Sequence, residues 1–163
     1  MYKISKTEFE DKFRLYSQEL MNISYGYTKS RDDSFDVVQN VFYKLFNSNK
    51  SFSTPNDEKY WLIRVTINES KDLLRQRKKV AIVDENTIDV FTDDKEAELK
   101  NQRLKKLSQI VGELPEKYRS VIILHYYDQL PVKDITIILK LSESAVKKRL
   151  ERARNMLKKE MEE

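Results

Sequence analysis

The stretch LPVKDITIILKLSESAVKKRLERARNMLKK, residues 130–159, contains two apolar stripes of helical spacing on either side of a short turn. The first stripe places three side chains on one face of a helix: Ile135, Ile138 and Leu139. Ser142 then stands where a second helix would begin, and its hydroxyl is a good acceptor for the free N–H groups of a helix start. The second helix has a narrow apolar stripe of Val146, Leu150, Ala153 and Leu157. This pattern predicts a helix-turn-helix.

The rest of the second helix is polar and strongly basic, with seven Lys or Arg side chains against two Glu in residues 142–159. Its surface side chains are Ser144, Lys147, Lys148, Glu151, Arg152 and Asn155, and the further cations are Arg149, Arg154, Lys158 and Lys159. In the major groove, Arg and Lys hydrogen-bond guanine, Asn hydrogen-bonds adenine, and other cations meet phosphates. The charge favours DNA binding over the alternative, a solvated amphipathic helix that closes a small bundle.

Composition favours a helical protein throughout. Only two of the 163 residues are glycine and three are proline, fewer than the turns of sheets and hairpins need. The chain has no cysteine, which excludes disulfides and thiolate metal sites and fits a reducing cytoplasm. No apolar run approaches the length of a membrane span, and the charged N-terminus is not typical of a signal peptide.

Three more helices are predicted in the N-terminal half. The first covers about residues 7–27 and is expected to break at Gly26 and the polar residues after it, and the second begins near Asp33. The third begins at Thr54 and Pro55, a capping residue followed by proline at the first helical position. One face of this third helix is apolar, and the other carries Trp61, Arg64, Asn68, Lys71, Asp72, Arg75 and Lys79.

An acidic stretch separates this half from the rest of the chain. Residues 81–100 carry seven acidic side chains against two lysines. We interpret them as a flexible linker rather than a strand, because no partner strand is predicted. Helix then resumes over about residues 98–111 and stops at Gly112, and a further helix starts with Pro115 in its first turn.

Three segments taken together resemble the bacterial sigma-70 family, specifically its small two-domain extracytoplasmic-function type. DVVQNVFYKLF resembles region 2.2, and WLIRVTINESKDLLRQRK resembles regions 2.3 and 2.4. The segment from LPEKYRSVIIL to SESAVKKRLERAR resembles region 4. Each segment alone is weak evidence, but their order and spacing are specific. The resemblance implies an all-α fold with region 2 over residues 1–80, a flexible acidic linker over 81–100 and region 4 over 101–163.

The resemblance also implies a function. Such proteins bind core RNA polymerase, through region 2 on the β′ clamp helices and region 4 on the β flap, and direct it to promoter DNA. Region 2 captures and helps to melt the −10 element, and region 4 reads the −35 element. An anti-sigma factor, often a membrane protein, is implied as a further partner, and the cytoplasm as the location. We expect no small-molecule substrate, cofactor, metal or enzymatic activity. The single histidine, His125, has no second histidine or cysteine to join it, and the chain has no glycine-rich phosphate loop and no Ser/His/Asp set.

Three groups of site residues follow from the resemblance. The core polymerase contact is assigned to Asp36, Gln39, Asn40, Tyr43 and Lys44, for which a plain solvent face is the alternative. The −10 contact is assigned to Trp61, Arg64, Asn68, Lys71 and Arg75, with Phe52 and Asn56 of the preceding loop as candidates for a pocket that holds a flipped base. The −35 contact is assigned to Ser142, Ser144, Lys147, Lys148, Arg149, Glu151 and Arg152.

The chain departs from the usual pattern of the family at several positions. Acidic residues are usual where Phe35 and Asn40 stand, and these changes affect the expected polymerase contact. Glycine is usual near Lys140, which therefore needs a left-handed or adjusted backbone. The loop before Trp61 lacks the usual spacing from phenylalanine to tryptophan. This tryptophan either stacks near the melting fork or braces the loop.

Two other functions remain open. A stand-alone helix-turn-helix regulator would explain residues 113–159, but neither the polar face of the third helix nor the acidic linker. A partner-binding adaptor would have a basic helix that only solubilises the chain. Run-off transcription with core polymerase distinguishes all three.

Overall fold

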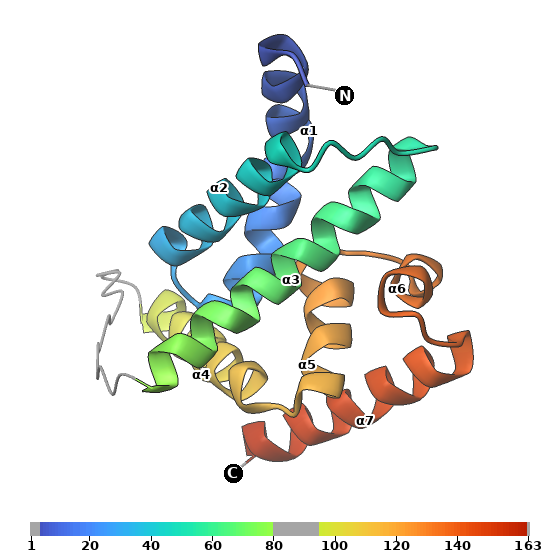
Figure 1. Ribbon diagram of the computed structural model, residues 1–163. Helices are drawn as coiled ribbons and strands as arrows, with labels where there is room; N and C mark the ends of the chain where they lie inside the picture. Colours follow the sequence, from blue (N-terminus) through green and yellow to red (C-terminus); the bar gives the residue numbers. More distant parts are fainter. Residues whose placement is uncertain (1–3, 80–94, 163) are drawn as a thin grey trace.

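Helices form nearly all of the structure. The computed structural model describes residues 4–79 and 95–162, and these two ranges contain no strand (Figure 1). The elements are α1 (Lys6–Thr28), α2 (Arg31–Asn47), α3 (Pro55–Lys79), α4 (Lys95–Glu113), α5 (Glu116–Ile122), the π-helical turn η1 (Ile123–Tyr127), α6 (Val132–Leu139) and α7 (Glu143–Glu162). The predicted all-α fold is confirmed. Most of the predicted linker, residues 80–94, lies outside the described residues.

The first three helices pack against one another into an N-terminal unit (Figure 1). Each begins at a hydroxyl side chain that accepts a backbone N–H group, as helix starts require. Ser5 accepts from Glu8 at 3.2 Å, Ser30 accepts from Asp33 at 3.2 Å, and Thr54 accepts from Asp57 at 3.1 Å. The predicted start of the third helix at Thr54 and Pro55 is confirmed.

The apolar face of α3 closes the core of this unit, as its spacing predicts. Its buried members are Leu62, Ile63, Thr66, Ile67 and Ser70. The two polar members are satisfied, because the Thr66 hydroxyl donates to the Leu62 carbonyl at 2.7 Å and the Ser70 hydroxyl donates to that of Ser24 at 2.9 Å. Small hydroxyl side chains therefore let α3 lie close to α1.

The remaining helices form a C-terminal unit that contains the predicted helix-turn-helix, α6 and α7. The Ser142 hydroxyl accepts the Ala145 N–H at 3.1 Å, which confirms the predicted cap. Lys140 has a φ of 56°, the left-handed conformation expected at this turn. Its N–H donates to the Thr136 carbonyl, a common way to end a helix. Val146, Leu150 and Ala153 of α7 are buried.

The two helices predicted to end at a glycine each pass it by one or two residues, and the first ends in the polar residues after Gly26, as expected. Helix α1 continues through Gly26 to Thr28 and ends at Lys29, which has a φ of 57°. Helix α4 passes Gly112 and ends at Glu113, and it begins at Lys95, inside the segment assigned to the linker. A glycine within a helix costs only about 1 kcal/mol relative to alanine, and packing of the flanking residues outweighs that cost.

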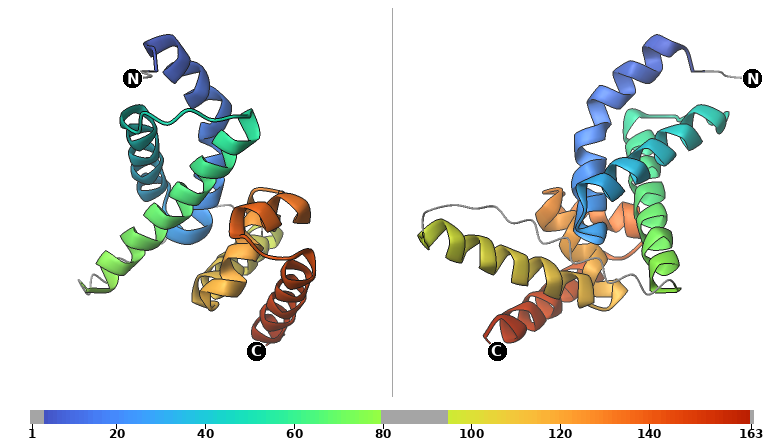
Figure 2. Two further views of the ribbon diagram at one scale, coloured as in Figure 1. Left: turned by 45° about the vertical axis from the view of Figure 1, so that its right-hand side comes forward. Right: turned by 90° about the vertical axis from the view of Figure 1, so that its left-hand side faces the viewer.

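The two units pack against each other and share one buried apolar cluster that runs from Ile4 to Ala153. Helix α1 contacts both η1 and α4, and α3 contacts α6. Figures 1 and 2 show α7 at the edge of the molecule, away from α1 and α2. Within the described residues, no helix combines the length and the apolar character that crossing a membrane demands.

Candidate nucleic-acid interface

The residues assigned to the −10 contact on α3 form one stripe, because they follow each other at intervals of three or four. Asn68 and Arg75 are exposed, whereas Trp61, Arg64 and Lys71 are half-buried. The structure therefore divides the stripe. Asn68 and Arg75 are exposed, whereas the other three contact more distant parts of the protein.

Arg64 contacts the helix-turn-helix. Its guanidinium donates through Nε to the Ile138 carbonyl at 3.0 Å and through a terminal nitrogen to the Ile137 carbonyl at 3.1 Å. Carbonyls in the last turn of a helix lack intrahelical partners and carry partial negative charge. The N–H groups of Lys140 and Leu141 both donate to Thr136. A cation from the N-terminal unit thus caps α6.

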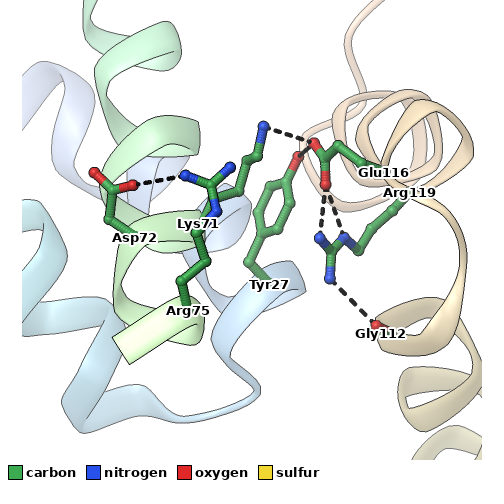
Figure 3. Close-up of polar contacts among 7 residues, drawn as sticks. All are labelled: Tyr27, Lys71, Asp72, Arg75, Gly112, Glu116 and Arg119. Carbon is green, nitrogen blue, oxygen red and sulfur yellow. Dashed lines mark hydrogen bonds and ion pairs between the residues drawn. The ribbon is translucent and has the colours of Figure 1, made fainter. Parts of the chain in front are cut away.

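Lys71 contacts the C-terminal unit through Glu116 (Figure 3). The Lys71 ammonium lies 3.5 Å from a Glu116 carboxylate oxygen, and the Tyr27 hydroxyl donates to the same oxygen at 3.3 Å. Arg119 donates to the other carboxylate oxygen at 2.7 Å and lies over the Tyr27 ring at 5.2 Å. Burial, followed by the Glu116 charge, raises the pKa of Tyr27 well above its usual value. One carboxylate thus serves two cations and a neutral phenol.

A cavity of about 560 Å³ opens between the units at this point. Its lining includes five cationic side chains: Lys29, Lys71, Arg75, Arg77 and Arg119. Arg77 is paired with Asp33, and Arg75 lies 3.2 Å from the exposed Asp72. Desolvation lowers the pKa of Lys29, whose ammonium donates to the Gln109 carbonyl at 3.3 Å. The excess of cations gives this edge of α3 a positive field suited to phosphates.

Trp61 braces the loop before α3. Its ring lies 5.8 Å from that of Phe52, centroid to centroid, and the Lys50 ammonium lies 5.4 Å from the Trp61 ring. Phe52 and Trp61 also pack against the buried cluster. Asn56, the second residue of α3, is exposed. The structure thus brings Phe52 beside Trp61.

The surface of α7 assigned to the −35 contact is open. Its exposed side chains are Ser142, Ser144, Lys147, Lys148, Glu151 and Arg152, and Arg149 is half-buried. Lys147 pairs with Glu143 at 2.8 Å, and this hydrogen bond lowers the pKa of the Glu143 carboxyl. The buried stripe of α7 faces inward, and its polar side therefore faces solvent, as reading of a major groove requires.

The residues assigned to polymerase, Asp36, Gln39, Asn40, Tyr43 and Lys44, are all exposed on α2. Tyr43 is 69% exposed, and two neighbours outside the assigned set, Phe35 and Phe46, are each 48% exposed. Large apolar side chains next to polar ones at a surface are typical of protein–protein interfaces. The usual acidic position is thus held here by an exposed aromatic side chain, Phe35.

Contacts between the two units were not predicted from the sequence. Tyr60 donates to Asp134 at 2.8 Å, and Glu116 joins Tyr27 to Lys71. No local pattern distinguishes these residues, because their partners lie more than 40 positions away in the chain. His125 is half-buried, and its Nδ1 lies 3.0 Å from the Leu130 carbonyl oxygen.

Comparison with known proteins matches both units to one family. Residues 13–80 match the family model Sigma-70 region 2, and residues 104–157 match Sigma-70, region 4. The RNA polymerase sigma factor SigV of Bacillus subtilis is 29% identical over 88% of this chain and 84% of its own length. The ECF RNA polymerase sigma factor SigW of the same organism is 25% identical over 94% of this chain and 88% of its own.

Two solved structures share the fold. CnrH in complex with the cytosolic domain of CnrY superimposes with a TM-score of 0.70 at 23% identity, over 94% of this chain and 87% of that one. The sigma factor RpoE of Bartonella quintana, in complex with the anti-sigma factor NepR, gives 0.69 at 21% identity, over 95% of this chain and 97% of that one.

Proposed function

This chain belongs to the sigma-70 family as an extracytoplasmic-function (ECF) RNA polymerase sigma factor, and from that premise we propose which of its surfaces meet the promoter and the polymerase. A sigma factor is a non-catalytic subunit that binds core RNA polymerase. The observation that carries the proposal is the pair of basic helix faces, one on α3 and one on α7, in two units that match regions 2 and 4 in order.

Recognition of the −35 element is assigned to α7. Lys148 and Arg152 are exposed one helical turn apart and reach base edges, with Ser144, Lys147 and Glu151 beside them. Ser142 and Arg149 lie at the start and the side of this surface, where backbone phosphates pass.

The −10 element is assigned to α3. Asn68 is exposed and hydrogen-bonds a base edge, while Arg64, Lys71 and Arg75 meet phosphates of the melted strand. Trp61 and Phe52 form an aromatic pair at the start of α3, beside which an unpaired base stacks, and Asn56 borders the same loop.

The contact with core polymerase is assigned to α2. The exposed patch of Tyr43 with Phe35 and Phe46, bordered by Asp36, Gln39, Asn40 and Lys44, docks on the β′ clamp helices. Aromatic side chains at the centre of a patch and polar ones at its rim match the anatomy of such interfaces. The C-terminal unit docks on the β flap. Because core polymerase acts in the cytoplasm, we place the protein there in this proposal.

An anti-sigma factor is proposed as a further partner. The CnrH and RpoE structures that share this fold each hold a sigma factor with such a partner, CnrY or NepR. Whether this chain has its own anti-sigma factor is tested by co-purification of the full chain from its source.

Run-off transcription with purified core polymerase tests the function. Core polymerase plus this chain should yield discrete transcripts from fragments of the source genome, and core alone should not. Tight, sequence-specific DNA binding without core, and no transcript, would instead indicate a stand-alone regulator.

A further inference from the structure

The cavity of about 560 Å³ lies where the end of α1, the C-terminal half of α3, the end of α4 and the start of α5 come together. Its volume is within the range of about 300–1,000 Å³ that is typical of small-molecule sites. Five of its ten lining residues are Lys or Arg, whereas one, Glu116, is acidic. The cavity thus has the size of a ligand site and a mainly cationic wall.

The Glu116 carboxylate shows how an anionic group is held in this cavity (Figure 3). One of its oxygens lies 3.5 Å from the Lys71 ammonium and accepts the Tyr27 hydroxyl at 3.3 Å. The other oxygen accepts from Arg119 at 2.7 Å. A single carboxylate therefore lies between two cations that come from different units, and its one negative charge neutralises only one of them.

Lys29 adds a third cation, and its surroundings compensate its charge poorly. Its ammonium lies against Gly112, where a Cβ atom would be 2.3 Å from the nitrogen, so the missing side chain leaves the space that the ammonium fills. The ammonium has three donors and gives one to the Gln109 carbonyl at 3.3 Å. Desolvation lowers the pKa of Lys29 despite the opposing charge of Glu113. A bound anion would stabilise the charged form of this side chain.

The two remaining cations, Arg75 and Arg77, have exposed side chains that already pair with carboxylates. Arg75 lies 3.2 Å from Asp72, and both of these side chains are more than half exposed. Such a pair contributes little, so Arg75 can exchange Asp72 for another anion. Arg77 binds the buried Asp33 through both terminal nitrogens. Arg75 is thus available to a ligand, whereas Arg77 serves the fold.

We propose that this cavity is a binding site for a small oligophosphate, a molecule with two or three linked phosphates such as pyrophosphate or the triphosphate of a nucleotide. Lys29 and Lys71 donate to its oxygens, and Arg75 meets it at the rim. Several cations around one cavity favour a multiply charged anion over sulfate or orthophosphate. The site goes beyond the proposed function, because it lies in the free chain and needs neither promoter nor polymerase.

Isothermal titration calorimetry of the full chain, in magnesium-free buffer at fixed ionic strength, tests the site. Pyrophosphate and ATP should each bind about tenfold more tightly than sulfate, as expected from one additional charge-assisted contact. Sulfate that binds as tightly as pyrophosphate would overturn the proposal. A single-stranded oligonucleotide that binds while pyrophosphate and ATP do not would also overturn it, and would assign these cations to DNA alone.

Two lysine variants locate the binding. Lys29→Met and Lys71→Met keep the apolar stem and remove the charge, and each should weaken pyrophosphate binding by about tenfold. Lys59→Met is the matched control, because Lys59 is also half-buried on α3 and also ion-paired, with Glu19 at 3.2 Å, but does not line the cavity. Unchanged affinity in both cavity variants, or an equal loss in Lys59→Met, would overturn the proposal.

Glu116→Gln should act in the opposite direction. It keeps the shape of the side chain and removes the one acidic group of the lining, so pyrophosphate should bind about threefold to tenfold more tightly. Weaker binding in this variant would contradict the account, provided that circular dichroism shows unchanged helix content. Binding to the free chain is measured without polymerase, so its failure and a failure of run-off transcription are distinguishable.

Discussion

The carboxyl group of Asp128, in the C-terminal unit, lies against the carboxylate of Glu19 on α1. Burial, and then the hydrogen bond and charge of Glu19, raise the pKa of Asp128 to about 9. Lys59 of α3 opposes this increase and pairs with Glu19 at 3.2 Å. One Asp128 oxygen is buried without a hydrogen-bond partner. At neutral pH Asp128 therefore keeps its proton, next to Glu19 across the interface.

Stability should fall as pH rises. The folded chain keeps a proton on Asp128 that the unfolded chain releases at about pH 4, so this contribution is complete below that pH and is lost as pH rises through about 9. For the wild type, the urea concentration at the midpoint of unfolding should be lower at about pH 9 than at about pH 6. Asp128→Asn should flatten the dependence, and Glu10→Gln, at an exposed site, should not. An equal slope in Asp128→Asn would contradict the assignment.

Loss of the Arg64 cap should cost stability. Arg64→Ala removes two charge-assisted hydrogen bonds to α6, worth about 1–3 kcal/mol together with the carbonyls left unpaired. Arg64→Lys should recover only part, because an ammonium lacks the planar fork that meets both carbonyls. Urea unfolding at neutral pH measures both. The same loss in the two variants would mean that Arg64 acts by charge alone.

Promoter specificity should change when α7 changes. Lys148→Ala and Arg152→Ala should each weaken recognition of a −35 base by about 1–3 kcal/mol and relax the preference at that base. Lys158→Ala, which removes a proposed phosphate contact, should weaken binding to all promoters alike and lower the salt dependence of that binding. Transcription from a set of −35 point variants separates the two effects, and an unchanged preference in both α7 variants would refute their assignment.

Promoter opening should depend on α3 residues that spare polymerase binding. Asn68→Ala removes an exposed amide proposed to hold a base of the melted strand, and Trp61→Ala removes the ring that packs on Phe52. Both should slow opening, followed by fluorescence of 2-aminopurine in the −10 element. Trp61→Phe should retain the bracing of the loop. If core binding is lost instead, these side chains serve the fold or the polymerase interface.

Polymerase binding should depend on the aromatic patch of α2. Tyr43→Ala and Phe35→Ala should each weaken core binding by about 1–2 kcal/mol, as for anchors at an interface centre. Competition against a labelled wild-type chain measures the change. Glu10→Gln serves as the surface control, and binding as tight as the wild type in both patch variants would place the contact elsewhere.

Local patterns predicted the helices because their causes are local. The Ser142 hydroxyl caps α7 by accepting the N–H of Ala145, three residues later in the chain. Lys140 has the left-handed backbone conformation, and the stripe through Val146 and Leu150 is buried. The exposed faces of α2 and α7 follow from the same periodicity. These elements required no knowledge of the rest of the chain.

The interface between the units could not be predicted in this way. Arg64 and Ile138 are separated by 74 positions in the chain. A cation on a helix face gives the same sequence pattern whether it binds phosphate or caps another helix. In the sequence, Gly26 suggests a helix end. In the structure it lies within α1, against the side chain of Ile123, which is nearly a hundred residues later in the chain. Contacts between segments that are distant in the chain leave no periodic pattern in the sequence.

The most direct test of the account is in vitro transcription of a library randomised upstream of the start site, with core polymerase and the full chain. Sequencing of the transcripts should recover two separate conserved blocks, and the Lys148→Ala, Arg152→Ala double variant should alter only the upstream block. Transcripts that do not depend on the chain, or a single block insensitive to α7, would contradict the account.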